Sequence, residues 1–277
     1  MVTRRIFLAG GAGLALTAAG CASGGAPTVP GPPAVPPPPR PVALTEPVTV
    51  ERVRSQARAT EVDLVLITPE GVPAAGLPVC LALHGRGGRA RTFLELGVPA
   101  MLTAAVRAGA PPFAIAALDG DHYWVAVDQR DDPQRMLTEE LPGWLSRRDL
   151  RPAPAAAFGI SMGAFGAYRY ARDHHDLKAV VGCSPALFVN WPDAKARKVF
   201  RDEQQWETNE PLRHIEELKP VPVGVWCGVG DPFAHAARRF AQNAAPAAAK
   251  FSAGAHNDKY WKRVLPDILK FIGSRLA

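Results

Sequence analysis

The serine at position 161 is the side chain of this sequence best placed to act as a nucleophile. It stands in the pentapeptide Gly-Ile-Ser-Met-Gly, with Gly159 and Gly163 two positions to either side. The apolar residues 153–160 predict a buried strand, and residues 162–174 predict a helix. At such a strand-to-helix turn, Gly-x-Ser-x-Gly lifts the serine hydroxyl clear of the sheet. The motif predicts an activated serine, with a glycine-rich packing turn as the alternative.

An activated serine needs a histidine to take its proton and a carboxylate to orient that histidine. Asp231 ends the predicted buried strand 221–231, and His256 follows the predicted strand that starts at residue 249. Serine, acid and histidine in this chain order match one of the known orders of a catalytic triad. We expect Asp231 to be the acid, although it also suits a helix N-cap, and His256 to be the base. The competing candidates are His235 for the base and Asp258 and Asp202 for the acid.

A glycine-rich loop, Leu-His-Gly-Arg-Gly-Gly at residues 83–88, follows another predicted strand. Attack on an ester carbonyl creates a negative oxygen that preorganised N–H groups must stabilise. We expect the backbone N–H of Met162 to be one donor and that of Arg86 the other, with Gly87 as the alternative donor. Glycines there also let the backbone approach a substrate, so Gly87 is a predicted substrate contact. The loop lacks the Gly-x-x-x-x-Gly-Lys-Ser/Thr frame of a phosphate loop.

The elements that must position these groups alternate between strand and helix. Residues 48–55 and 61–71 alternate in polarity and predict an antiparallel opening. Continuous apolar runs predict buried strands at 77–85, 112–120, 153–160, 178–184 and 221–231. Helices are predicted at 91–109, 132–150, 162–174, 211–219 and 260–276. The pattern predicts an α/β fold with a mostly parallel central sheet and helices on both of its faces.

The first 47 residues are predicted to lie outside this domain. Residues 1–20 resemble a twin-arginine export signal, with Arg4 and Arg5 ahead of an apolar run that is too short for a membrane span. The sequence before Cys21 resembles a lipobox, which would make Cys21 a lipidated N-terminus. Ala18 stands where leucine is usual, so plain cleavage is the alternative. Residues 21–47 predict a proline-rich, extended linker, and residues 48–277 the folded domain.

Composition limits the kinds of partner. The chain has 32 Lys and Arg against 26 Asp and Glu, a formal net charge of +6, but the basic residues are scattered. They lack the clustering with aromatic residues that is typical of a nucleic-acid surface, so no nucleic-acid partner is expected. Cys80, Cys183 and Cys227 each lie in an apolar run and are predicted to be buried. They allow one disulfide at most, and no spacing indicates a metal site.

Five segments together carry a resemblance to a known family: "LHGRGG", "ALDGDHYW", "GISMGAFGAYR", "GVGDPF" and "GAHNDKYW". From Val48 to its end the chain resembles the α/β-hydrolase superfamily. Within it, the resemblance is to the serine esterases of the esterase D and S-formylglutathione-hydrolase-like group, which is related to bacterial mycolyltransferases. The resemblance implies an α/β-hydrolase fold and a serine carboxylesterase without a cofactor, whose triad is Ser161, Asp231 and His256.

Two features depart from that family pattern. Residues 186–219 look too short for a large lid, which predicts open access to the serine. The segment "DGDHYW" replaces a common Asp-Gly-Gly form. Tyr123 and Trp124 within it are predicted to line the acyl pocket, with a place in the core as the alternative for both.

These observations favour an exported enzyme that cleaves small-molecule or lipid esters. We expect it at the outer face of the cytoplasmic membrane, held through lipidated Cys21, or secreted. Transfer of the acyl group to an envelope lipid or sugar is an alternative, because it uses the same acyl-enzyme. A catalytically silent surface-binding protein is the alternative from another class.

Overall fold

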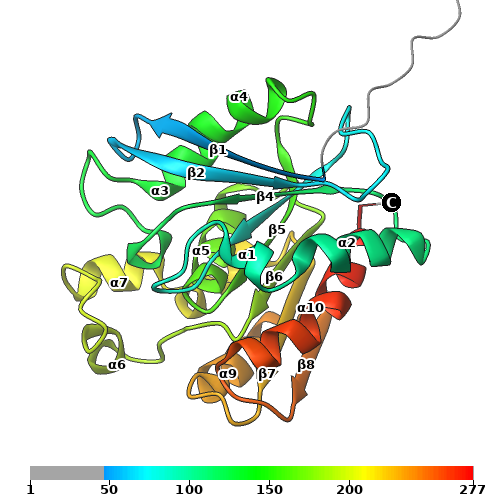
Figure 1. Cartoon of the computed structure of the whole chain (residues 1–277). Helices are drawn as coiled ribbons and strands as arrows, with labels where there is room; N and C mark the ends of the chain where they lie inside the picture. Colours follow the sequence, from blue (N-terminus) through cyan, green and yellow to red (C-terminus); the bar gives the residue numbers. More distant parts are fainter. Residues whose placement is uncertain (1–46, 277) are drawn as a thin grey trace, which may run out of the picture. The chain divides into compact units, whose positions relative to one another are not determined.

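The computed structural model describes residues 47–276. The predicted export signal, Cys21 and the linker up to residue 46 lie outside the described residues. A single eight-stranded sheet, in the order β1-β2-β4-β3-β5-β6-β7-β8, organises the domain (Figure 1). Its strands are β1 (Val48–Ser55), β2 (Thr60–Ile67), β3 (Val79–Leu83), β4 (Ala114–Leu118), β5 (Pro154–Ile160), β6 (Ala179–Cys183), β7 (Val223–Gly228) and β8 (Ala248–Ser252).

The sheet combines an antiparallel edge with a parallel body. Strand β2 pairs antiparallel with both β1 and β4, and each strand in the order β4-β3-β5-β6-β7-β8 is parallel to the next. Both predictions, the antiparallel opening and the mostly parallel sheet, are confirmed. Because the carboxyl ends of parallel strands meet at one edge, the loops after β3, β4, β5, β6 and β7 meet there.

Helices cover both faces of the sheet and form two hydrophobic cores. One face carries α1 (Thr92–Glu95), α2 (Val98–Arg107) and α10 (Asp258–Gly273); the other carries α4 (Leu141–Ser146), α5 (Met162–Asp173) and α9 (Ala234–Ala244). Strand β3 shows why both faces are apolar: Leu81 and Leu83 pack in one core, and Cys80 and Ala82 in the other. The helix predicted over 91–109 is divided at Gly97, whose φ of 85° breaks it into α1 and α2.

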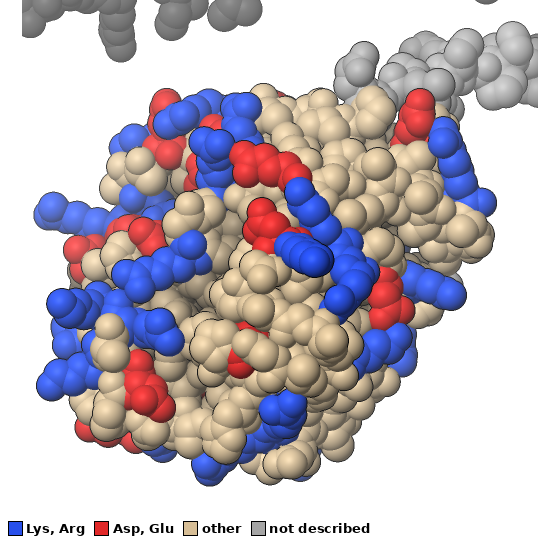
Figure 2. Space-filling model, turned by 60° about the horizontal axis from the view of Figure 1, so that its bottom comes forward, with Lys and Arg blue, Asp and Glu red and all other residues tan. Residues whose placement is uncertain are grey.

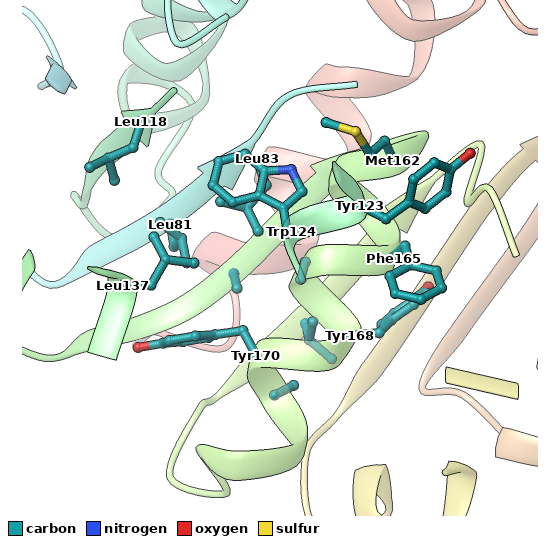
Figure 3. Close-up of a cluster of buried hydrophobic side chains, with 14 of the residues drawn as sticks. Leu81, Leu83, Leu118, Tyr123, Trp124, Leu137, Met162, Phe165, Tyr168 and Tyr170 are labelled. Carbon is teal, nitrogen blue, oxygen red and sulfur yellow. The ribbon is translucent and has the colours of Figure 1, made fainter. Parts of the chain in front are cut away.

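The core beneath α5 is packed with aromatic side chains. Figure 3 shows Phe165, Tyr168 and Tyr170 projecting from this helix, beside Trp124 and the leucines of β3. A Cβ atom on Gly166 would lie 2.5 Å from the Trp124 side chain, so the helix can pack this closely only because residue 166 is glycine.

Short helices fill the connections. They are α3 (Pro133–Arg135), α6 (Trp191–Lys195), α7 (Glu203–Asn209), α8 (Ile215–Leu218), the 3-10 turns η1 (His122–Trp124) and η3 (Pro211–Arg213), and the π-helical η2 (Met136–Glu140). None of the helices between residues 47 and 276 is long and apolar enough to cross a membrane.

Surface charge and cysteine placement follow the composition. On the face seen in Figure 2, Lys and Arg side chains are spread among Asp and Glu. Cys80, Cys183 and Cys227 are unpaired and buried, as predicted.

Candidate active site

The backbone around Ser161 makes the sharp turn that its two glycines predict. Ser161 follows β5 directly, with φ 57° and ψ −117°, and α5 begins at the next residue. A Cβ atom on Gly159 would lie 2.0 Å from the carbonyl oxygen of Gly163. One on Gly163 would lie 1.9 Å from the carbonyl oxygen of Leu83. No side chain fits at either position, so the turn requires glycine at both.

The three residues predicted as a triad are hydrogen-bonded in series. The Nε2 atom of His256 lies 2.8 Å from the hydroxyl oxygen of Ser161. On the other side of the ring, Nδ1 lies 2.9 Å from Oδ2 of Asp231. An ionised Asp231 only accepts hydrogen bonds, so Nδ1 carries the ring proton and Nε2 accepts the serine hydroxyl. The ring is thus oriented to take the serine proton.

Asp231 is buried but stays ionised. Burial raises the pKa of its carboxyl group, yet hydrogen bonds from His256 and from the N–H of Phe233 outweigh that effect, so that the pKa lies below its usual value. The Ser184 hydroxyl also lowers this pKa. The Asp231 side chain is fully buried, whereas 22% of the His256 side chain is exposed, so the charge is shielded behind the histidine.

Backbone contacts fix the acid and the histidine relative to each other. The N–H of Gly230, just before the acid, donates to the carbonyl of Gly254 over 2.9 Å. A Cβ atom on Gly228 would lie 2.4 Å from that same carbonyl oxygen. The loops that carry Asp231 and His256 therefore touch through their main chains.

The competing candidates are placed elsewhere. His235 is exposed on α9, and Asp258 is exposed at the start of α10. Asp202 caps α7, where its carboxylate accepts the N–H of Gln205 over 2.7 Å. Within the described residues, none of the three is hydrogen-bonded to Ser161.

The predicted oxyanion donors belong to two segments beside the serine. Met162 is the first residue of α5, and Arg86 lies in the loop after β3. Their N–H groups donate to no acceptor between residues 47 and 276, which leaves both free for a ligand oxygen. Gly87 is exposed at φ 75° and does not line the pocket at Ser161, so its contact with a substrate stays a prediction.

His84 holds the loop that carries Arg86, a role that the sequence analysis missed. Its Nε2 accepts the N–H of Gly120 over 3.0 Å, so Nδ1 carries the proton and donates to the carbonyl of Gly85 over 2.8 Å. Burial lowers the pKa of His84, which keeps the ring neutral. Asp119 adds a second tie by accepting the N–H of Ala90 over 2.8 Å. The segments "LHGRGG" and "ALDGDHYW" both carry the family resemblance, but the sequence does not indicate that they are in contact.

A pocket of about 420 Å³ opens at Ser161. Of the predicted residues, Arg86, Tyr123 and His256 also line it. The pocket residues that the sequence analysis did not predict are Gly85, Arg197, Pro232, Phe233 and Trp261. Arg197 comes from the short segment 186–219, which forms one wall of the pocket and is no large lid, as predicted.

Neighbouring Tyr123 and Trp124 have different surroundings. Three successive residues from His122 to Trp124 have positive φ angles of 49°, 57° and 59°. Both side chains of this left-handed turn are buried in the same core (Figure 3), but Tyr123 also lines the pocket, whereas Trp124 does not. The Trp124 indole N–H donates to the carbonyl of His84 over 3.3 Å. The prediction of Trp124 as a pocket residue is wrong, because adjacent aromatic residues do not reveal which one will line a pocket.

Two aromatic rings enclose the histidine. The ring centroids of Phe233 and Trp261 lie 5.2 Å and 5.3 Å from that of His256. The Trp261 indole N–H donates to the Ser184 hydroxyl over 3.1 Å, which connects this ring to the surroundings of Asp231. Both aromatic residues follow their catalytic candidates closely in sequence, within "GVGDPF" and "GAHNDKYW".

No group of three or more His, Cys, Asp or Glu side chains within residues 47–276 is arranged to hold a metal ion. The geometry at the pocket instead matches nucleophilic catalysis: a serine hydroxyl bonded to a neutral histidine, that histidine bonded to a carboxylate, and two free N–H groups nearby.

Comparisons with known proteins agree with this geometry. The model of the family Esterase, described as "Putative esterase", matches residues 55–272. The comparison with curated proteins found no match. Among solved structures, a ferulic acid esterase is similar at 21% identity and a TM-score of 0.68, over 83% of this chain and 98% of that one.

Two further solved structures show the same fold. An S-formylglutathione hydrolase from Agrobacterium tumefaciens has 17% identity and a TM-score of 0.67, over 82% of this chain and 95% of that one. MPT51 (FbpC1) of Mycobacterium tuberculosis has 18% identity and a TM-score of 0.68, over 84% of this chain and all of the other (100%). The chain therefore belongs to the Esterase family, as a serine carboxylesterase-type hydrolase of the α/β-hydrolase fold.

Proposed function

We propose that this protein hydrolyses carboxylic esters through an acyl-enzyme on Ser161, with His256 as the base and Asp231 as the orienting acid. The observation that carries the proposal is the 2.8 Å contact between Nε2 of His256 and the serine hydroxyl. This contact places a proton acceptor directly on the nucleophile.

The first half-reaction acylates the serine. Ser161 Oγ attacks the ester carbonyl while its proton moves to Nε2 of His256, and the carbonyl oxygen becomes an oxyanion. The N–H groups of Met162 and Arg86 are the donors available to stabilise that charge. When the intermediate collapses, the bond to the alcohol breaks and His256 returns the proton to the leaving alcohol. Asp231 stays ionised throughout and stabilises the imidazolium.

The second half-reaction repeats these steps with water. His256 removes a proton from water, the hydroxide attacks the acyl carbonyl, and Ser161 leaves and takes the proton back. The acid is released and the free enzyme is restored. A sugar or lipid hydroxyl in place of water would transfer the acyl group instead, so products must be identified as well as counted.

Fluorophosphonate labelling tests the proposal, because these probes phosphonylate activated serines. We expect one adduct on Ser161, identified by mass spectrometry, together with hydrolysis of 4-nitrophenyl butyrate. Both signals should disappear in Ser161→Ala. Ser146→Ala, which changes an exposed serine of α4, should keep both. Absence of an adduct in the folded wild-type protein would contradict the proposal.

Export is the second part of the proposal and rests on residues 1–21. Their twin-arginine pattern and the cysteine after Ala-Ala-Gly support export and then lipidation of Cys21. Expression of the full chain in a bacterial host that is fed an alkyne fatty acid tests this. A labelled membrane-bound protein that loses its label in Cys21→Ser is expected. A protein that is cleaved but not labelled would support export and contradict the lipid anchor.

A further inference from the structure

The pocket at Ser161 contains two positive charges and no negative one. Arg86 and Arg197 both line it, whereas none of its lining residues is Asp or Glu. Neither guanidinium forms an ion pair with any residue between 47 and 276. Asp231, the carboxylate behind the pocket, is occupied by His256. The pocket is therefore positive and lacks a counter-charge from the protein itself.

Arg197 is held in place by aromatic rings. Its guanidinium carbon lies 4.9 Å from the ring centroid of Phe233 and 5.7 Å from that of Phe188. The Nε atom is buried and has no hydrogen-bond partner in the structure. A buried donor without an acceptor is unfavourable, and few such groups persist in folded proteins without a reason. Stacking fixes the plane of the guanidinium group and leaves its donors available to a ligand.

Tyr123 lies in the same pocket as both arginines. Burial raises the pKa of the Tyr123 hydroxyl to about 12, and the positive charges of Arg197 and Arg86 oppose that rise. Being protonated, the hydroxyl is itself a donor. Three side chains with donor groups thus line one pocket that has no carboxylate among its lining residues.

We propose that this pocket selects esters carrying a carboxylate, or a similar anion, separated from the scissile carbonyl by a short apolar spacer. The inference rests on the proposed esterase function. Arg197 binds the anion through its planar fork of donors, and exposed Arg86 adds attraction at the pocket mouth. The aromatic side chains of Phe233 and Trp261 contact the spacer. A space of about 420 Å³ suits a small ester of this kind.

Matched pairs of esters that differ only in charge test the proposal, with the anion on either side of the ester bond. The acyl-side pair is mono-4-nitrophenyl glutarate against 4-nitrophenyl pentanoate. The alcohol-side pair is 4-acetoxybenzoate against its methyl ester. For each pair, kcat/KM of the anionic ester is divided by that of the neutral ester. This ratio is then divided by the same ratio for hydroxide-catalysed hydrolysis, which corrects for the intrinsic reactivity of the two esters. The wild-type enzyme is expected to favour the anion about tenfold or more in one of the pairs.

Variants assign the preference to the arginines. Arg197→Met should reduce the favoured ratio about tenfold, and Arg86→Met should reduce it less, because Arg86 is exposed to solvent. Arg238→Met is the matched control, since Arg238 also stacks on an aromatic ring, Phe251, but is not a pocket residue. It should leave the ratio unchanged. Raised salt concentration should weaken the wild-type preference.

Two outcomes would overturn the proposal: no charge preference in either pair, or a preference that survives Arg197→Met. If Arg197→Met does not fold, Arg197→Lys replaces it. Lysine keeps the charge but loses the planar fork, so it should give an intermediate ratio. Hydrolysis of the neutral esters and the adduct on Ser161 report on the esterase function separately. A failure of anion selection alone therefore leaves that function intact.

Discussion

Asp231 and Glu210 are both buried carboxylates, yet the protein shifts their pKa values in opposite directions. Asp231 receives hydrogen bonds from His256 and from the N–H of Phe233, and its pKa lies below the usual value. Glu210 accepts three hydrogen bonds: the N–H of Phe188 over 3.1 Å, the indole of Trp206 over 3.0 Å and the N–H of Leu212 over 3.2 Å. Burial nevertheless raises the pKa of Glu210 to about 8.

The difference has two causes: Glu210 is the more deeply buried carboxylate, and only Asp231 has a titratable partner. All donors to Glu210 are neutral, whereas the ring that contacts Asp231 can accept a proton and become positive. Asp231 is suited to stabilise a charge that appears during a reaction. Glu210 instead joins the loop at Phe188 to α7 and so shapes the wall on which Arg197 stacks. Asp231 is the acid of the proposed mechanism, whereas Glu210 connects structural elements.

The largest expected effect comes from neutralising Asp231, the proposed catalytic carboxylate. In Asp231→Asn, the amide N–H faces Nδ1 of His256, so the ring proton moves to Nε2 and the ring can no longer accept the serine proton. We expect kcat for 4-nitrophenyl butyrate to fall about 10⁴-fold, with little change in the denaturation midpoint. A loss of less than about tenfold would remove Asp231 from the proposed mechanism.

Glu210→Gln should change the dependence of stability on pH rather than catalysis. The folded protein holds the Glu210 proton up to about pH 8, whereas the unfolded chain releases it near its ordinary value of 4.5. The stabilisation is full below pH 4.5 and is lost as pH rises to about 8, by at most about 1.4 kcal/mol per pH unit. Urea unfolding of Glu210→Gln between pH 5 and pH 8.5 should lack this loss.

The matched control for that experiment is Glu207→Gln, because Glu207 lies on α7 and pairs with Arg213 at the surface. It should follow the wild-type pH dependence. If the free energy of unfolding depends on pH in the same way in Glu210→Gln and the wild type, the raised pKa of Glu210 is contradicted.

The smallest effect is expected at Ser184, which is adjacent to Asp231 but outside the proposed triad. Ser184→Ala removes a hydroxyl that lowers the pKa of Asp231 and accepts the Trp261 indole N–H. We expect kcat to fall about fivefold, equivalent to about 1 kcal/mol, and the adduct on Ser161 to form more slowly. Ser274→Ala, at the exposed end of α10, serves as the control. A loss as large as that of Asp231→Asn would instead place Ser184 within the catalytic group itself.

The sequence predicted those features that local patterns determine. Continuous apolar runs identified the parallel strands, because only strands buried on both faces are apolar at every position. Ser161, Asp231 and His256 could be found because Ser161 directly follows a strand and the other two lie in loops just after a strand, and parallel strands bring their following loops to one edge. Gly159 and Gly163 marked the turn, since the structure leaves no space for a Cβ atom at either position.

The remaining site residues depend on contacts that no local pattern encodes. Arg197 comes from a segment without a regular apolar period, in which Glu210 accepts the N–H of Phe188 and the Phe188 ring contacts Arg197. Trp124 and Tyr123 have the same aromatic character, and the left-handed turn at His122 separates them. Side-chain direction within an irregular turn is a tertiary property.

The turn at His122–Trp124 also couples the lining of the pocket to the packing of the core. Tyr123 contacts the ligand space, and its immediate neighbour Trp124 packs against Gly120 and Gly166 in the core. A mutation that re-aims Tyr123 by altering the turn will also displace Trp124. Under the proposed anion selection, a change at Arg197, on the pocket wall that residues 186–219 form, alters substrate preference without displacing Trp124, whereas a change at residue 123 affects stability as well. Directed evolution of this enzyme should accumulate its first specificity changes on that wall.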